Sequence, residues 1–140
     1  MIPRQMSDMV RNQNPLTLPK GTAVQQACRA MRDRKVGAVL VTGPSGELVG
    51  IFTGRDAVCR VVAEGLNPML TTLEDVMTGN PDKMAPGKNA VDALRIMKDG
   101  GYRHLPVVEG GKIVGVVSRG DFRGLEQDRL DEETGIWERI

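Results

Sequence analysis

The sequence comprises 140 residues, of which 40% are hydrophobic, 26% charged and 3% aromatic, and its formal net charge is +1. This length is typical of about one domain and leaves no room for a catalytic domain beside a regulatory one. The balanced charge argues against nucleic-acid binding, and no segment approaches the roughly 20 apolar residues that a membrane helix needs. The start of the chain lacks the apolar core of a signal peptide, so we expect a cytoplasmic protein. Because so few residues are aromatic, we expect the hydrophobic core to be aliphatic.

The first part of the chain predicts an extended piece, a helix and a hairpin. The expected elements are an extended piece at 15–18, a helix at 22–34, strands at 38–42 and 47–52, and a second helix from about Thr53. The first helix is indicated by Val24, Cys28 and Met31, which recur at helical spacing opposite a charged face. The strands are short apolar runs on either side of a Gly- and Pro-containing turn, which is typical of a hairpin. Residues 65–72 are rich in turn-forming residues and predict a linker.

The same series of elements then occurs a second time. Its members are an extended piece at 82–85, a helix at 89–99, strands at 104–108 and 112–117, and a helix from about Ser118. Most matching positions are 66 residues apart, as Ala27 and Ala93 are, and the last ones are 65 apart. Asp8 and Asp75 also match, so the repeat includes the segments ahead of the extended pieces. An internal repeat of this length indicates two copies of one structural unit.

We therefore expect one repeat over residues 1–66, a second over 67–124 and an acidic tail over 125–140. The tail carries two basic and six acidic residues and is expected to be partly helical. Five apolar residues interrupt it: Leu125, Leu130, Ile136, Trp137 and Ile140. An exposed apolar end of this kind favours docking onto the body of the protein, onto a second copy or onto a partner.

The most distinctive motif is Gly-φ-φ-Thr/Ser-x-x-Asp, where φ is apolar, and it lies at a predicted strand-to-helix corner in both repeats. It spans residues 50–56 in the first repeat and 115–121 in the second. A structural interpretation is available, because a Thr or Ser at a helix N-cap and an Asp three positions later can form a capping box. A functional interpretation stays open as well. The helix start attracts phosphate, the hydroxyl donates to it, the Asp accepts from a ribose diol, and the glycine lets a ligand approach the backbone.

These motifs, together with Asp75-Val-Met-Thr78 and Arg103-His-Leu-Pro-Val107, resemble a tandem pair of cystathionine-β-synthase (CBS) domains of the stand-alone bacterial type. The resemblance covers roughly residues 6–124. It implies an α+β fold of two βαββα-type repeats related by a pseudo-twofold axis, with sheets packed on each other, helices outside and clefts between the repeats. It also implies a regulatory, non-catalytic module that forms a homodimer and relays ligand binding to an effector protein of unknown identity.

The ligands implied by the resemblance are adenosine compounds such as AMP, ADP, ATP, NAD or S-adenosylmethionine, with the ribose held by the motif Asp and the phosphate by the Thr or Ser. The candidate ligand-binding residues are Gly50, Thr53 and Asp56 in the first repeat and Arg103, His104, Pro106, Gly115, Ser118, Arg119 and Asp121 in the second. The second repeat has an Arg-His pair that can donate to phosphates, where the first has Gly37 and Ala38. We therefore expect the two clefts to be occupied unequally.

No constellation for catalysis or metal binding can be assembled from this sequence. His104 is the single histidine, and no second ligand stands at metal spacing. Cys28 and Cys59 fall inside predicted helices and are expected on their apolar sides, where thiols are unreactive. We therefore expect neither an enzyme nor a metal protein, and no catalytic cofactor. The alternative to a nucleotide sensor is a non-catalytic scaffold whose two motifs serve only as helix caps.

Overall fold

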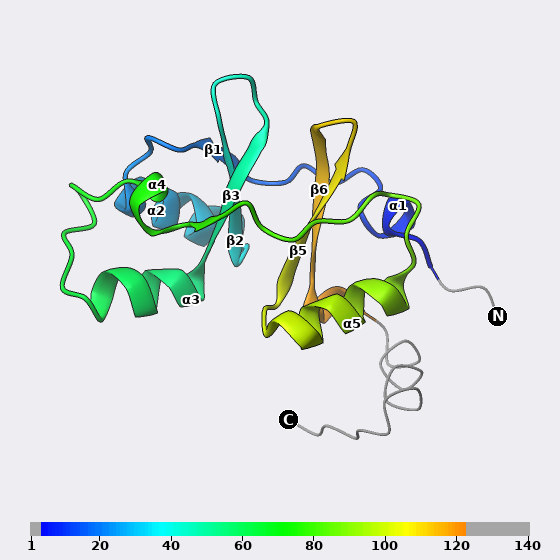
Figure 1. The fold of residues 1–140 in the computed structure, drawn as a ribbon. Coiled ribbons are helices and arrows are strands. Elements are labelled where there is room, and N and C mark those ends of the chain that lie inside the picture. The colour runs from blue at the N-terminus through cyan, green and yellow to red at the C-terminus, as the bar shows by residue number, and fades with distance from the viewer. Residues whose placement is uncertain (1–3, 123–140) are drawn as a thin grey trace. The chain divides into compact units, whose positions relative to one another are not determined.

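Two sheets organise the computed structural model, which describes residues 4–122 (Figure 1). One sheet has the strand order β1-β2-β3-β4, and the other is the pair β5-β6. The strands are β1 (Thr17–Pro19), β2 (Ala38–Thr42), β3 (Leu48–Thr53), β4 (Thr78–Gly79), β5 (His104–Glu109) and β6 (Lys112–Ser118). Together with the helices they form the α+β fold expected from the sequence.

Two longer helices and several single turns accompany the strands. They are α1 (Met6–Met9), α2 (Val24–Arg34), α3 (Gly54–Asp56), a π-helical turn (Ala57–Val62) directly after α3, α4 (Leu73–Val76), α5 (Ala90–Gly100) and a 3-10 turn (Arg119–Asp121). α2 and α5 confirm the helices predicted at 22–34 and 89–99, and each is capped at its C-terminus by a left-handed residue, Lys35 or Gly101. No helix in residues 4–122 combines the length and the apolar character that crossing a bilayer requires.

The chain divides into two compact units, and the first consists of residues 14–82 with residues 110–113. In its sheet β1 runs parallel to β2, whereas β2, β3 and β4 pair in antiparallel order. Val39 lies opposite Phe52 in the central pair, and both are fully buried. The core combines Leu16, just ahead of β1, with apolar residues from the sheet, α2, the π-helical turn and α4: Val24, Ala27, Met31, Val39, Val41, Phe52, Val61, Leu73 and Val76. The sheet is therefore covered by the apolar stripe that the sequence predicts on α2.

The second unit is made, within the described residues, of three segments: 4–13, 83–109 and 114–122. β5 and β6 form a hairpin whose turn contains Gly110 and Gly111, both at positive φ, which glycine adopts without a steric penalty. In the predicted extended piece 82–85, Met84 forms a parallel bridge with Val107. The core combines residues of α1, α5 and the hairpin with Val10, which follows α1, and with Met84: Met6, Val10, Met84, Ala90, Ala93, Met97, Leu105, Val107 and Val117.

Each compact unit contains the first segment of the other repeat. Residues 71–79, at the start of the second repeat, belong to the first unit, and residues 4–13, at the start of the first repeat, belong to the second. We call these two stretches the exchange segments. The units in space therefore differ from the sequence repeats 1–66 and 67–124, because each exchange segment packs against the other repeat.

Matching contacts fix both exchange segments. Gln5 forms an antiparallel bridge with Asn89 just ahead of α5, and Thr72 forms one with Ala23 just ahead of α2. Each segment contains a single helical turn, α1 or α4, that begins with a capping box. The first residue of each turn, Met6 or Leu73, is fully buried. Each core is thus completed by an apolar side chain from the other repeat.

The helix predicted from Thr53 is present as α3 and the π-helical turn, but the predicted burial of Cys59 is wrong. Cys59 is exposed, whereas Cys28 on α2 is half-buried. The buried face of this segment is formed by Val61 and the partly buried Ala57. These two residues are four positions apart, so Cys59, midway between them, projects from the opposite face.

Two further expectations lie partly or wholly outside the described residues. The helix predicted from Ser118 begins with the 3-10 turn over Arg119–Asp121, and its continuation falls beyond residue 122. The acidic tail over 125–140, with its apolar residues, also lies outside the described residues.

Candidate functional site

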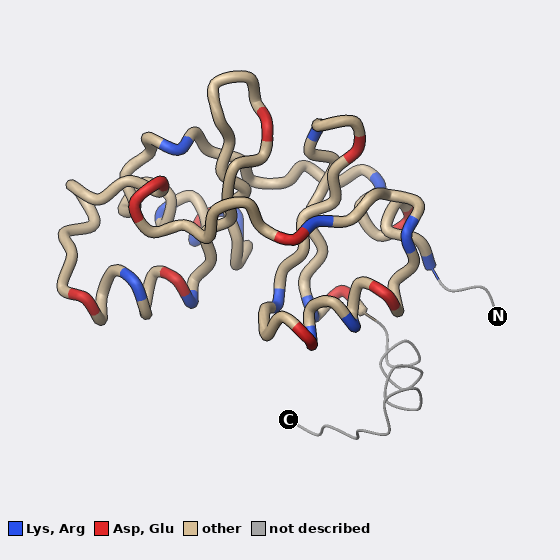
Figure 2. Tube along the Cα trace, in the orientation of Figure 1, with Lys and Arg blue, Asp and Glu red and all other residues tan. Residues whose placement is uncertain are grey.

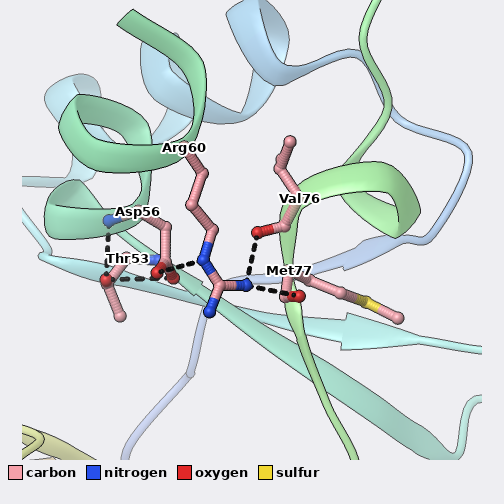
Figure 3. A network of polar contacts seen from close by, with 5 residues as sticks. All are labelled: Thr53, Asp56, Arg60, Val76 and Met77. Carbon is pink, nitrogen blue, oxygen red and sulfur yellow. Dashed lines mark hydrogen bonds and ion pairs between the residues drawn. The ribbon is translucent and has the colours of Figure 1, made fainter. Parts of the chain in front are cut away.

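The first motif folds into a closed hydrogen-bonded corner where β3 ends and α3 begins (Figure 3). Asp56 Oδ2 accepts from Thr53 N at 2.9 Å and from Thr53 Oγ1 at 3.1 Å. Asp56 N donates back to Thr53 Oγ1 at 3.3 Å, which completes a capping box. We call Thr53 and Asp56 the first corner. The structural interpretation of this motif is therefore correct, and the Asp side chain is held by its own N-cap.

Arg60 adds a second layer of contacts to the first corner. Its Nε atom lies 3.7 Å from Asp56 Oδ1, and its Nη1 atom donates to the carbonyls of Val76 at 3.2 Å and Met77 at 3.0 Å (Figure 3). The Asp56 side chain is 15% exposed and that of Arg60 49%. Both carboxylate oxygens of Asp56 thus have a partner, and the guanidinium joins the corner to an exchange segment.

The second motif forms the same kind of corner with fewer partners. Asp121 Oδ2 accepts from Ser118 N at 2.7 Å, and the capping box between these two residues is complete. Asp121 is exposed, and its backbone carbonyl accepts from Arg4 Nη2 at 3.1 Å. Within residues 4–122 no hydrogen bond reaches its Oδ1 atom. We call Ser118 and Asp121 the second corner.

Matching backbone hydrogen bonds connect each corner to the residue ahead of the neighbouring strand. Gly54 N donates to the Gly37 carbonyl at 3.2 Å, and Arg119 N donates to the Arg103 carbonyl at 2.8 Å. In the second unit, this hydrogen bond places the backbone of Arg103 beside the second corner. A ligand site there would need a nearby cation of this kind. The first unit offers only a glycine at the matching position, so the two corners differ in their nearby cations.

His104 is the first residue of β5 and is half-buried. Burial lowers the pKa of its imidazole and the Arg103 guanidinium lowers it further, whereas the Asp121 carboxylate acts in the opposite direction. The side chain therefore experiences the charges of both neighbours and is biased toward its neutral form. A bound phosphate would favour the protonated form.

The two motif glycines have a different role from the one expected. A Cβ atom on Gly115 would lie 2.5 Å from Val10 Cβ and 2.6 Å from Gln13 Oε1. A Cβ atom on Gly50 would collide with the Met77 side chain. The space beside both glycines is therefore filled by an exchange segment, and the expectation that they let a ligand approach the backbone is corrected.

Two other candidates of the second repeat contribute in different ways. Pro106 is buried, and its carbonyl accepts from Met84 N at 3.0 Å, so it takes part in the strand pairing of the second unit. Arg119 is half-buried and begins the 3-10 turn of the second corner. Sequence reasoning missed Arg4 and Arg60. The sequence contained a signal for Arg60, because an Arg four positions after an Asp on a helix is placed to form an ion pair with that Asp.

The described part of the chain holds no cluster of three or more His, Cys, Asp or Glu side chains that could bind a metal ion. The chemistry present at the corners is that of hydrogen-bond acceptors and cations. These groups suit a polar ligand that carries hydroxyls and negative charge.

Comparison with known proteins identifies one family over both halves of the chain. A sequence model of the CBS domain matches residues 6–62 and again residues 73–127. The CBS domain-containing protein CBSCBSPB3 of Arabidopsis thaliana is 44% identical over 108 residues, which cover 77% of this chain and 19% of that protein. The chain thus spans about a fifth of the length of this plant relative.

Solved structures of CBS domain proteins share the fold. The CBS domain protein PAE2072 of Pyrobaculum aerophilum, complexed with AMP, has a TM-score of 0.81 at 22% identity, with 91% of this chain and 98% of that chain covered. The CBS domain pair of protein MJ0100, in complex with 5′-methylthioadenosine and S-adenosyl-L-methionine, has a TM-score of 0.77 at 20% identity, with 95% and 99% covered. CBS domain pairs are regulatory modules. Because the family model matches both halves, this chain belongs to the CBS domain family and carries two CBS domains in tandem.

Proposed function

We propose that this chain is a non-catalytic regulatory module that binds an adenosine-containing nucleotide at its second corner. The observation that carries the proposal is the exposed carboxylate of Asp121. Its Oδ2 atom is engaged by Ser118 N, whereas its Oδ1 atom accepts no hydrogen bond within residues 4–122. An ionised carboxylate has acceptor sites on both oxygens, so Oδ1 offers what a ribose diol needs.

The neighbours of Asp121 supply the complementary part of the ligand contact. Arg103 is tied to the corner through its carbonyl, Arg119 begins the turn, and His104 lies close enough for its pKa to respond to Asp121. Cations and imidazole N–H groups donate strong hydrogen bonds to phosphate. AMP, ADP, ATP, NAD and S-adenosylmethionine each combine a ribose with a charged group. The AMP complex of the Pyrobaculum protein and the S-adenosylmethionine complex of MJ0100 support this choice, since both share the fold.

The distribution of charge favours a small ligand over a polyanion. Lys and Arg residues are interspersed with Asp and Glu along the described trace (Figure 2). A nucleic-acid surface needs an excess of basic residues, whereas this chain has a formal net charge of +1. A single nucleotide needs only the few cations at one corner.

Binding becomes a signal when the ligand prefers one arrangement of the protein over another. A ligand shifts such an equilibrium only by its difference in affinity for the two arrangements. The recipient of the signal is, in this proposal, an effector protein whose identity the sequence does not define.

Self-association is the second part of the proposal. Exposed apolar side chains gather on the π-helical turn and the loop after it: Val58, Val62, Leu66, Met69 and Leu70. Leu70 is 81% exposed and Val62 74%. Apolar surface of this kind marks an interaction site, and a second copy of the chain would bury it in a homodimer. Light scattering should give the mass of a dimer for the wild type and of a monomer for Val62→Lys. A monomeric wild type would refute the homodimer.

Calorimetric titration of the full chain with AMP, ADP, ATP, NAD and S-adenosylmethionine tests the binding function. We expect at least one of these compounds to bind and Asp121→Ala to weaken it at least about tenfold, since a hydrogen bond to a charged group contributes about 1.5–3 kcal/mol. Asp33→Ala is the matched control, because Asp33 is exposed on α2 and pairs with the adjacent Arg32 at 2.9 Å. Absence of binding by all five compounds would refute the function.

A scaffold without a ligand is the competing function, and one observation favours it. The capping boxes at both corners are complete with protein groups alone. If the motif Asp residues served only as caps, Asp121→Ala would lower stability by about 0.5–2 kcal/mol and change no nucleotide affinity.

A further inference from the structure

We infer that Arg60 closes the first corner against a ribose and thereby confines nucleotide binding to the second corner. The inference rests on the proposed function, because it concerns which of two matching corners accepts the ligand. It is drawn from the contacts of Arg60 and from the residue at the matching position of the second repeat.

Arg60 forms an ion pair with the carboxylate oxygen that a ribose would use. Asp56 Oδ2 already accepts from the backbone and the hydroxyl of Thr53, and Arg60 Nε lies 3.7 Å from Oδ1. The carboxylate is also largely buried, with 15% of its side chain exposed. A ribose hydroxyl that donates to Oδ1 therefore competes with the guanidinium for this oxygen and weakens the ion pair.

The other end of the guanidinium makes displacement of Arg60 more costly. Arg60 Nη1 donates to the carbonyls of Val76 and Met77, which end α4 (Figure 3). The last carbonyls of a helix have no partner within the helix, so these bonds satisfy groups that would otherwise need water. Arg60 is thus a latch that joins Asp56 to the exchange segment 71–79.

Among residues 4–122, no arginine makes the matching contact with Asp121. Asp56 and Asp121 are 65 positions apart, so the residue that matches Arg60 is Leu125. A leucine side chain has no hydrogen-bond donor and no charge. Asp121 is exposed where Asp56 is half-buried, which agrees with a corner that is open to a ligand.

A rival role for Arg60 predicts the opposite effect. If Arg60 turned toward solvent and held a ligand phosphate, its loss would weaken nucleotide binding at the first corner. If it is a latch, its loss creates binding there. The sign of the change therefore separates the two roles.

The decisive experiment is a titration of the full chain with AMP, and in a second series with ATP, in which the stoichiometry is measured. We expect wild type to bind at a single site that Asp121→Ala removes and Asp56→Ala leaves unchanged. Arg60→Leu, which introduces the residue found at the matching position 125, should bind at two sites. The added site should disappear in the double variant Arg60→Leu, Asp56→Ala. A single site in Arg60→Leu, or a wild type that fills both corners, would overturn the inference.

Hydrogen exchange of the ligand-free protein tests the latch without any nucleotide. We expect Arg60→Leu to raise exchange several-fold at the amides of residues 71–79, and Arg60→Lys to give an intermediate rate because it retains the charge with fewer donors. The control is Arg32→Leu, since Arg32 pairs only with the adjacent Asp33 among the described ion pairs. Unchanged exchange in Arg60→Leu and Arg60→Lys would overturn the latch. If wild type bound none of AMP, ADP, ATP, NAD and S-adenosylmethionine while exchange rose as expected, the latch would stand and the proposed function would fail.

Discussion

Gly115 lies against Val10 so closely that a Cβ atom on the glycine would be 2.5 Å from the valine Cβ. Gly50 stands in the same relation to the other exchange segment, where an added Cβ would be 3.0 Å from the Thr78 carbonyl oxygen. The glycine of the repeated motif is thus the residue against which the exchange segment packs, and the Thr/Ser and Asp of the motif form the corner. One short motif therefore serves both packing and the candidate site.

Replacement of Gly115 by Ala should destabilise the second unit by about 1–3 kcal/mol, because the branched Val10 side chain leaves no room for a methyl group. Urea denaturation of the variant measures this change in the free energy of unfolding. Gly87→Ala is the control, since a Cβ atom there meets nothing within 4 Å. Equal stability of the two variants would contradict the packing that the structure describes.

Shortening the buried side chain of either exchange segment should destabilise the compact unit into which that side chain packs. Leu73 is fully buried in the first unit and Met6 in the second, so Leu73→Ala and Met6→Ala should each cost about 2–5 kcal/mol. Hydrogen exchange should rise in α2 for Leu73→Ala and in α5 for Met6→Ala.

The control for these truncations is Val36→Ala, because Val36 is 39% exposed and lies outside both the exchange segments and the apolar surface proposed for self-association. The reverse pattern, with Met6→Ala loosening α2, would show that the segments pack on their own repeats.

Acidification should destabilise the protein partly through His104. Its pKa is lowered in the folded state by burial and by Arg103, against the opposing effect of Asp121. The unfolded chain therefore takes up the proton first, at a pKa of about 6.5, and stability falls as the pH drops through that value. His104→Gln should lose less stability than wild type between about pH 7.5 and pH 5.5, as measured by urea denaturation. A variant as sensitive to pH as wild type would exclude this contribution.

The two thiols should differ in reactivity. Cys59 is exposed, whereas burial raises the pKa of the Cys28 thiol and so reduces its thiolate fraction. A thiol-specific reagent at pH 8 should therefore modify one group rapidly and the other slowly. Cys59→Ser should abolish the rapid phase and Cys28→Ser should preserve it; the converse would contradict the exposures of the two thiols in the structure.

Local patterns in the sequence predicted the longer elements well. α2 and α5 carry apolar residues at helical spacing, and the two hairpins are apolar runs around Gly-containing turns, so local physics defines them. The turns α1 and α4 are too short for such periodicity to detect. The exchange of segments 4–13 and 71–79 is a choice between two similar repeats, and no local pattern distinguishes them.

The candidate site was predicted in part. The Thr53–Asp56 and Ser118–Asp121 contacts follow from the capping-box spacing. The contacts of Arg60 with Val76 and Met77 depend on where α4 packs, so the sequence could indicate its pairing with Asp56 but not its second role. The role of Gly50 and Gly115 was misread for the same reason, because their neighbours belong to the exchange segments.

The measurement that tests the central claim most directly is the calorimetric titration of wild type and Asp121→Ala with AMP and the related nucleotides. The claim predicts saturable binding by wild type, an affinity at least about tenfold lower in Asp121→Ala, and a loss of stability no larger than the roughly 0.5–2 kcal/mol of a helix cap. Equal affinity of the two proteins would contradict it and leave Asp121 as a cap alone.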